Sequence, residues 1–108
     1  MQINIRQVDN AIILDVDGNV DLQNSPAMRK ALLENLKLTP CVIVNLREVP
    51  YIDSSGIASL VEGLKRSHDL KNRLVLVGLS PMAHKVLDLT RLTPLFEIHE
   101  NEEQALNG

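Results

Sequence analysis

The sequence predicts an α/β domain with a mixed, mostly parallel sheet of about five strands and four helices, in the order β-β-α-β-α-β-α-β-α. Short apolar runs alternate along the chain with stretches of helical periodicity, the pattern of parallel strands joined by helices. The run 42–46 (Val-Ile-Val-Asn-Leu) is almost continuously apolar, as expected of a strand covered on both faces. Two Ser-Pro pairs mark helix starts. A chain of 108 residues is the size of one domain, which we expect to span residues 1–108.

The chain is expected to begin with an antiparallel hairpin. Residues 2–8 alternate between apolar and polar side chains, Asp9-Asn10 makes the turn, and residues 11–16 supply the second strand. A loop then leads to a helix that begins at Ser25-Pro26, where the serine hydroxyl would accept from a free backbone N–H group. This helix ends before Thr39-Pro40.

The rest of the chain repeats strand and helix. Strands are expected at 41–46, 74–77 and 95–98, and a terminal helix is expected to begin near residue 101 with a capping box. The helix between the first two of these strands has an apolar stripe formed by Ile57, Leu60, Val61 and Leu64. The helix that begins at Ser80-Pro81 is expected to turn inward Met82, Val86 and Leu89.

The composition argues against several classes of function. Fourteen acidic and eleven basic residues give a net charge of −3 and no basic patch, and aromatic residues make up only 2%, so we expect no nucleic-acid partner. The three histidines lie far apart without ligand spacing, so neither a metal nor another cofactor is expected. With no signal peptide and no apolar run of about 20 residues, we expect no membrane contact and a cytoplasmic location.

The most informative stretch is 51–57, Tyr-Ile-Asp-Ser-Ser-Gly-Ile. Small polar residues directly before an apolar helical stripe place Asp53 and Ser54 at a helix N-terminus, where either can cap free N–H groups. That end of a helix tolerates negative charge, so a phosphate there would add about two negative charges to the surface with little damage to the fold. The same residues also make a good capping sequence that requires no function.

Catalytic interpretations have less support. The Gly-x-Ser-x-Gly spacing of a nucleophile elbow is absent, because Ile52 stands where the first glycine belongs. No histidine neighbours Ser54 or Ser55 in the sequence, so a hydrolase would need one brought close by the fold. The acids and the lysine of a phospho-acceptor receiver domain are not in the expected places, since no lysine follows residue 85. We therefore expect a protein that is not an enzyme.

Five stretches of the chain form a recognisable pattern together: Gly18-Asn19-Val20-Asp21, Val42–Leu46, Tyr51–Ile57, Leu79-Ser80-Pro81 and Val86–Leu92. With these stretches the whole chain, from Met1 to Leu106, resembles the STAS domain family, and within it the small anti-sigma factor antagonists of bacteria. The chain departs from the family at Ala58-Ser59, where a Gly-Val type of pair is common.

The resemblance implies a phosphoprotein that regulates transcription by partner switching. In such proteins the serine directly after the aspartate is phosphorylated by the anti-sigma factor, a serine kinase with a GHKL-type ATP site, and a PP2C-type phosphatase removes the phosphate. The unphosphorylated antagonist sequesters the kinase and frees the sigma factor. Carried onto this chain, the phosphorylation site is Ser54, with Asp53 orienting its loop and Gly56 allowing close approach of the partner backbone. We expect the partner-binding residues to be Asp21, Asp53, Ser55, Gly56, Ile57, Ser80 and Met82.

The resemblance also leaves an alternative function. STAS domains serve as constitutive structural subunits of signalling scaffolds or lipid-transport complexes, where no phosphate cycle is needed. Incubation with the cognate kinase and labelled ATP separates the two, because absence of label on Ser54 would favour the structural subunit.

Overall fold

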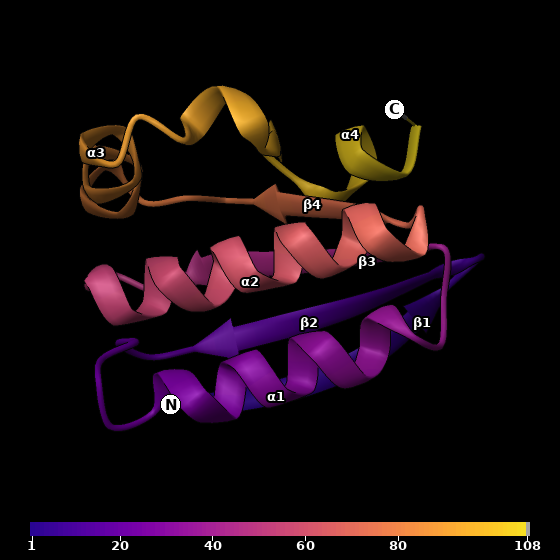
Figure 1. Cartoon of the computed structure of the whole chain (residues 1–108), viewed down its shortest axis with the longest axis horizontal. Coiled ribbons are helices and arrows are strands. Elements are labelled where there is room, and N and C mark those ends of the chain that lie inside the picture. The colour runs from indigo at the N-terminus through magenta and orange to yellow at the C-terminus, as the bar shows by residue number, and fades with distance from the viewer. Residues whose placement is uncertain (108) are drawn as a thin grey trace.

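The computed structural model describes residues 1–107 as a five-stranded mixed sheet with helices packed on both of its faces (Figure 1). Its elements are, in order, β1 (Gln2–Val8), β2 (Ala11–Asp17), α1 (Ser25–Leu36), β3 (Cys41–Glu48), α2 (Ser54–Leu70), β4 (Arg73–Val77), α3 (Pro81–Leu89), a 3₁₀ helix (Thr93–Leu95), β5 (Glu97–His99) and α4 (Glu102–Asn107). The predicted fold class and element order are confirmed. Over these residues, no helix has the length and apolar character needed to span a membrane.

The strands lie in the order β1-β2-β3-β4-β5. β1 pairs with β2 antiparallel, and every other neighbouring pair is parallel. Each crossover therefore joins adjacent strands, and α1 and α2 lie side by side over one face of the sheet (Figure 1). The loops that lead into α1, α2 and α3 all follow the carboxyl ends of strands, so they meet at one edge of the sheet. That edge positions the candidate site.

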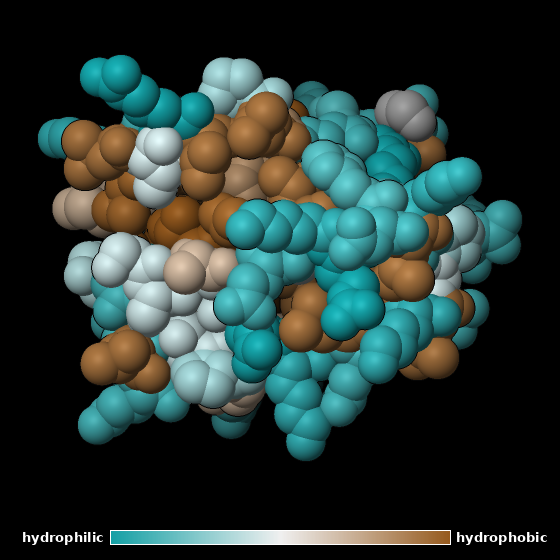
Figure 2. Space-filling model, viewed as in Figure 1, coloured by the Kyte–Doolittle hydropathy of each residue, from teal (hydrophilic) through white to brown (hydrophobic). Residues whose placement is uncertain are grey.

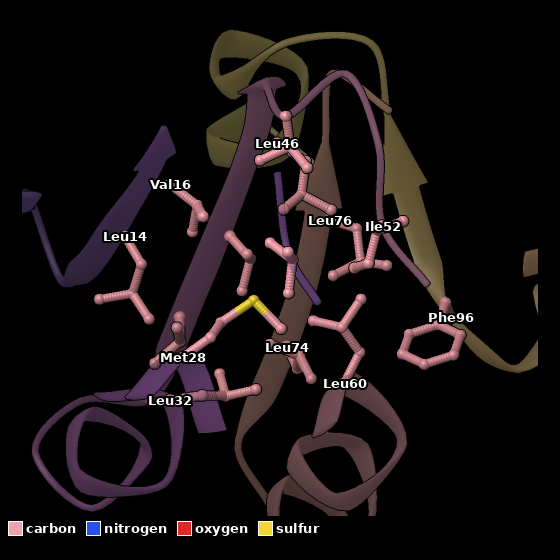
Figure 3. Close-up of a cluster of buried hydrophobic side chains, with 14 of the residues drawn as sticks. Leu14, Val16, Met28, Leu32, Leu46, Ile52, Leu60, Leu74, Leu76 and Phe96 are labelled. Atoms are coloured by element: carbon pink, nitrogen blue, oxygen red, sulfur yellow. The ribbon is translucent and has the colours of Figure 1, made fainter. Parts of the chain in front are cut away.

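The main core lies between the sheet and the helices α1 and α2. It is aliphatic apart from Phe96, and Met28 and Leu60 are fully buried in it (Figure 3). Burying each such large apolar side chain is worth about 1.5–3 kcal/mol. Gly63 brings the two helices close, because a Cβ at this position would overlap the side chain of Leu32 in α1. The packing of α1 against α2 fixes the orientation of α2, and so the position of its N-terminal end.

The predicted cap of α1 is wrong. Ser25 is the first helical residue and is 4% exposed, and the N-cap position belongs to Asn24. The turn before the helix is instead closed by reciprocal bonds: the Asp21 amide donates to Asn24 Oδ1 (2.8 Å), and the amides of Gln23 and Asn24 donate to Asp21 Oδ1 (3.0 and 3.2 Å). Asp21 thus stabilises the loop in which it lies.

The inward face of α3 also differs from the prediction. Met82 and Leu89 are 50% and 79% exposed, whereas Ala83 and Leu87 are fully buried. Val86 is half-buried against the main core, as predicted. The cap at Ser80 is as predicted, since its Oγ accepts from the amide of Ala83 at 3.0 Å. The last strand is shifted as well: β5 spans Glu97–His99, and the start of the predicted segment forms the 3₁₀ helix.

Candidate functional site

The start of α2 is held by the carboxylate of Asp53, the N-cap residue. Its Oδ1 accepts from the amides of Ser55 (2.9 Å) and Gly56 (3.2 Å) and from the hydroxyl of Ser55 (2.5 Å). The Ser55 hydroxyl, followed by these amides and that of Leu22, holds the pKa of Asp53 below its usual range. Two amides of the first turn, those of Ser55 and Gly56, are therefore already bound to a negative charge supplied by the chain.

Ser54, the first residue of α2, differs from every other serine. Of the six serines in the chain it alone is exposed, and within residues 1–107 its hydroxyl takes part in no hydrogen bond that the structure describes. The neighbouring Ser55 hydroxyl is committed to Asp53. Of the two adjacent serines, the structure thus leaves Ser54 accessible to an incoming enzyme.

A short parallel bridge joins the loop before α1 to the loop before α2. The Val20 amide donates to Tyr51 O at 2.9 Å, and the Asp53 amide donates to Val20 O at 3.1 Å. The bridge brings the loop of Asp21 against that of Asp53, although the two aspartates lie 32 positions apart in the sequence. No local signal in the sequence could have predicted this contact.

Gly56 and Ile57 face the interior. A Cβ on Gly56 would lie 2.8 Å from Ile52 Cδ1 and 2.9 Å from Val20 Cγ1, so the absence of a side chain is required by internal packing against the bridge. The structure thus gives this glycine a role in internal packing, and the expected close approach of a partner backbone at Gly56 stays a prediction. Ile57 is only 2% exposed and lies at the floor of a surface groove.

The start of α3 is tied to the same loop. The Ser80 hydroxyl donates to Pro50 O at 3.3 Å, while Met82 in the first turn extends into solvent. Two further exposed apolar side chains, Leu22 (75%) and Tyr51 (44%), lie on the loops joined by the bridge. Neither residue is among the predicted partner-binding residues, although Tyr51 begins the stretch 51–57 and is one of only two aromatic residues in the chain.

An apolar groove begins at Ser54. It encloses about 390 Å³ and is lined by Ser54, Ile57, Ala58, Val61, Glu62, Lys65, Thr90 and Leu92. Hydrophobic side chains gather around α3 in the space-filling view (Figure 2). The Ser54 hydroxyl therefore borders a surface with the apolar character of a protein-binding site.

Neither serine at the start of α2 has a histidine partner within residues 1–107. Among the residues that the structure describes, no histidine ring bonds to Ser54 or Ser55: His84 contacts Asp88, and His99 contacts Glu97. No group of three or more metal-ligating side chains occurs in residues 1–107. The geometry is that of an exposed serine hydroxyl at the edge of an apolar groove.

Comparison with known proteins gives a consistent result. The family model described as STAS domain matches residues 2–105. The chain is 31% identical to an anti-sigma-B factor antagonist of Listeria monocytogenes, over 100% of this chain and 94% of that protein. It is 24% identical to the anti-sigma-B factor antagonist of Bacillus subtilis, over 95% and 94% of the two chains.

Solved structures share the fold. An anti-sigma factor antagonist from Mycobacterium paratuberculosis matches with a TM-score of 0.89 and 20% identity, over 98% of this chain and 91% of that one. The anti-sigma factor antagonist SpoIIAA in its unphosphorylated form matches with a TM-score of 0.76 and 17% identity, over 98% and 96%.

Proposed function

Because this chain belongs to the STAS domain family, we propose that it is an anti-sigma factor antagonist whose binding is switched by phosphorylation of Ser54. One observation carries the proposal: at the start of α2, Ser54 is the only exposed serine in residues 1–107, and it directly follows the capping Asp53. The unphosphorylated protein sequesters an anti-sigma factor that is a serine kinase of the GHKL type. A PP2C-type phosphatase resets it. The protein is a substrate of both enzymes, acts in the cytoplasm by binding, and forms one domain over its whole length.

The proposed binding surface surrounds Ser54. It comprises the exposed side chains of Leu22, Tyr51 and Met82, which lie on three loops or helix starts joined by backbone and side-chain hydrogen bonds. Asp21 and Ser80 stabilise two of these segments from within, so their part in binding is to position the surface. Exposed apolar and aromatic side chains on a rigid frame are the usual anchors of protein interfaces.

The switch follows from electrostatics. A phosphoserine carries a charge of about −1.5 to −2 at pH 7. The amides of Ser55 and Gly56, which could otherwise solvate that charge, are already bonded to the Asp53 carboxylate. A phosphate on Ser54 therefore adds to an existing negative charge and has to be desolvated when an apolar partner surface covers it. We expect the loss of affinity to be several kcal/mol, without a change of fold in the antagonist.

Both forms of a relative are compatible with this switch. The unphosphorylated and phosphorylated structures of SpoIIAA match this chain with TM-scores of 0.76 and 0.75, so this chain's fold is equally close to both forms. Such a pair supports a mechanism in which the phosphate changes the surface and leaves the fold in place.

The modification is tested with the anti-sigma factor of the same organism and labelled ATP. Label is expected on Ser54 of the wild type, none on Ser54→Ala, and undiminished label on Ser55→Ala. Mass spectrometry of the digested protein locates the phosphate. Label that persists in Ser54→Ala would place the acceptor elsewhere, and absence of label in the wild type would favour a constitutive structural subunit.

The role of charge is tested with a matched pair of variants. Ser54→Asp and Ser54→Asn have similar size and differ by one negative charge. We expect Ser54→Asp to bind the anti-sigma factor at least tenfold more weakly than Ser54→Asn in isothermal titration calorimetry, a difference of about 1.4 kcal/mol. Equal affinities would show that charge is not the switch.

A further inference from the structure

A second hollow, larger than the groove beside α2, lies away from Ser54. It encloses about 730 Å³, nearly twice the volume of the groove beside α2, and falls within the range of about 300–1,000 Å³ that is usual for small-molecule sites. None of the expected partner-binding residues lines it. The residues around it are Arg47, Gly78, Leu79, His84, Thr93, Phe96, Ile98, His99, Glu100 and Gln104.

The place of the hollow in the fold is one that favours ligands. Arg47 lies near the carboxyl end of β3, Gly78 directly follows β4, and His99 ends β5. These three strands are parallel, and ligands of open α/β sheets bind outside the carboxyl ends of such strands. Gly78 has φ of +71°, and a Cβ there would lie 3.1 Å from the backbone nitrogen of Arg47, so only glycine allows the two main chains to approach at this edge.

Arg47 supplies a positive charge to the hollow. Arg6, Arg29 and Arg73 each pair with a carboxylate, whereas the part of the chain that the structure describes contains no ion pair of Arg47. Its backbone is fixed, because the Arg47 amide donates to Asn45 Oδ1 at 3.1 Å. An arginine held at the rim of a concave site can bind a carboxylate or a phosphate through two parallel hydrogen bonds.

The other lining residues indicate which further chemical groups a ligand of this hollow would carry. His84 Nδ1 lies 3.4 Å from Asp88 and His99 Nε2 lies 2.9 Å from Glu97, which leaves one ring nitrogen of each histidine for a further hydrogen bond. Phe96, Leu79 and Ile98 supply apolar surface. Glu100 is the one carboxylate on the lining, so a ligand with a single anionic group suits the hollow better than a polyanion.

We propose that this hollow binds a small organic anion, in which one carboxylate or phosphate group is held by Arg47 and an apolar portion lies against Phe96. The two histidines donate or accept hydrogen bonds at the polar side of the ligand. The site is independent of Ser54 phosphorylation, and its test does not depend on the proposed function.

The test is a titration of the ¹⁵N-labelled protein followed by NMR. Benzoate, phenyl phosphate and octanoate serve as anionic probes, and benzamide is the uncharged counterpart of benzoate. We expect at least one anionic probe to give saturable shifts of the amides at positions 47, 78–79 and 96–100, and to bind at least tenfold more tightly than benzamide. The probe that binds best distinguishes a carboxylate from a phosphate and an aromatic from an aliphatic body.

Arg47→Gln and Arg91→Gln form a matched pair of variants. Both arginines are exposed, and only Arg47 lines the hollow. We expect Arg47→Gln to weaken anion binding at least tenfold and Arg91→Gln to leave it unchanged, with thermal unfolding confirming that both variants are folded. Absence of saturable shifts with every anionic probe, shifts centred elsewhere, or equal affinities of the two variants would overturn the proposal.

Discussion

Replacing Asp53 by alanine measures how far the start of α2 depends on one carboxylate. Asp53 Oδ1 accepts three hydrogen bonds, two from backbone amides and one from the Ser55 hydroxyl. Loss of an N-cap side chain lowers the free energy of unfolding by about 0.5–2 kcal/mol. Because Asp53 Oδ1 accepts three hydrogen bonds, we expect the loss in Asp53→Ala to lie in the upper part of that range, at about 1–2 kcal/mol. In a domain of this size each kcal/mol lowers Tm by about 4–8 °C, so Tm is expected to fall by about 4–16 °C.

The assay is urea unfolding followed by circular dichroism at several pH values. Asp53→Asn keeps an acceptor oxygen and loses the charge, so at pH 7 it should lose only the favourable interaction with the helix dipole, about 0.3–1 kcal/mol. The pKa of Asp53 is lowered in the folded protein, so the stability from its charge is present above the unfolded pKa of about 3.9. That stability is lost as the pH falls through the folded pKa, and the difference between wild type and Asp53→Asn should then close.

A control and a refuting result complete this test. Asp69→Asn changes an exposed carboxylate of the same helix that makes no hydrogen bond described in residues 1–107, and it should stay within about 0.5 kcal/mol of wild type. If Asp53→Ala unfolds at the same urea concentration as wild type at pH 7, the cap does not hold the helix start and the reasoning fails.

Two further predictions concern packing and acid stability. Gly56→Ala is expected to lower the free energy of unfolding by about 1–3 kcal/mol, because its Cβ would overlap Ile52 and Val20; an unchanged urea midpoint would contradict the packing described. Arg6→Gln is expected to make stability less dependent on acid. Arg6 donates to Asp15 and holds the pKa of that carboxyl below its usual range, so the stability it provides near neutral pH disappears as the pH falls through the folded pKa. Denaturation at pH 7 to 3 should show a shallower decline than in wild type, and parallel curves would argue against this contribution.

The start of α2 could be predicted from the sequence because its determinants are local. The cap at Asp53, the two amides that it binds and the apolar stripe that follows lie within a few turns of one helix. The same holds for the Ser80 cap of α3. Elements fixed by short-range geometry are accessible to pattern and propensity alone.

The face that α3 turns inward could not be predicted in this way. Met82, Val86 and Leu89 have helical spacing, but so do Ala83 and Leu87. The structure buries Ala83 and Leu87, and of the predicted set only Val86 packs, half-buried, against the core. Small Ala83, fully buried, allows α3 to approach the core closely, a requirement set by neighbouring elements. Hydrophobicity alone favours the larger Met82.

The bridge between Val20 and Ile52 is a second feature beyond local reasoning. It joins two loops through backbone hydrogen bonds, which do not depend on the type of side chain and so cannot be predicted from it. The bridge also explains why there is no room for a side chain at Gly56. The packing around the bridge therefore gives a reason for glycine at position 56 that is separate from its expected part in partner binding.

The hydrogen bonds already made by amides at the start of α2 have a consequence for how the two states of the proposed switch would differ. With Asp53 already bonded to the amides of Ser55 and Gly56, these two donors are not free to capture a group attached to Ser54. The two states of the proposed switch would then differ in one covalent bond and share one backbone conformation, so no equilibrium between conformers limits how completely either state is populated. The fraction of protein in each state would then be set by the rates of the two opposing enzymes and not by a conformational equilibrium of the antagonist.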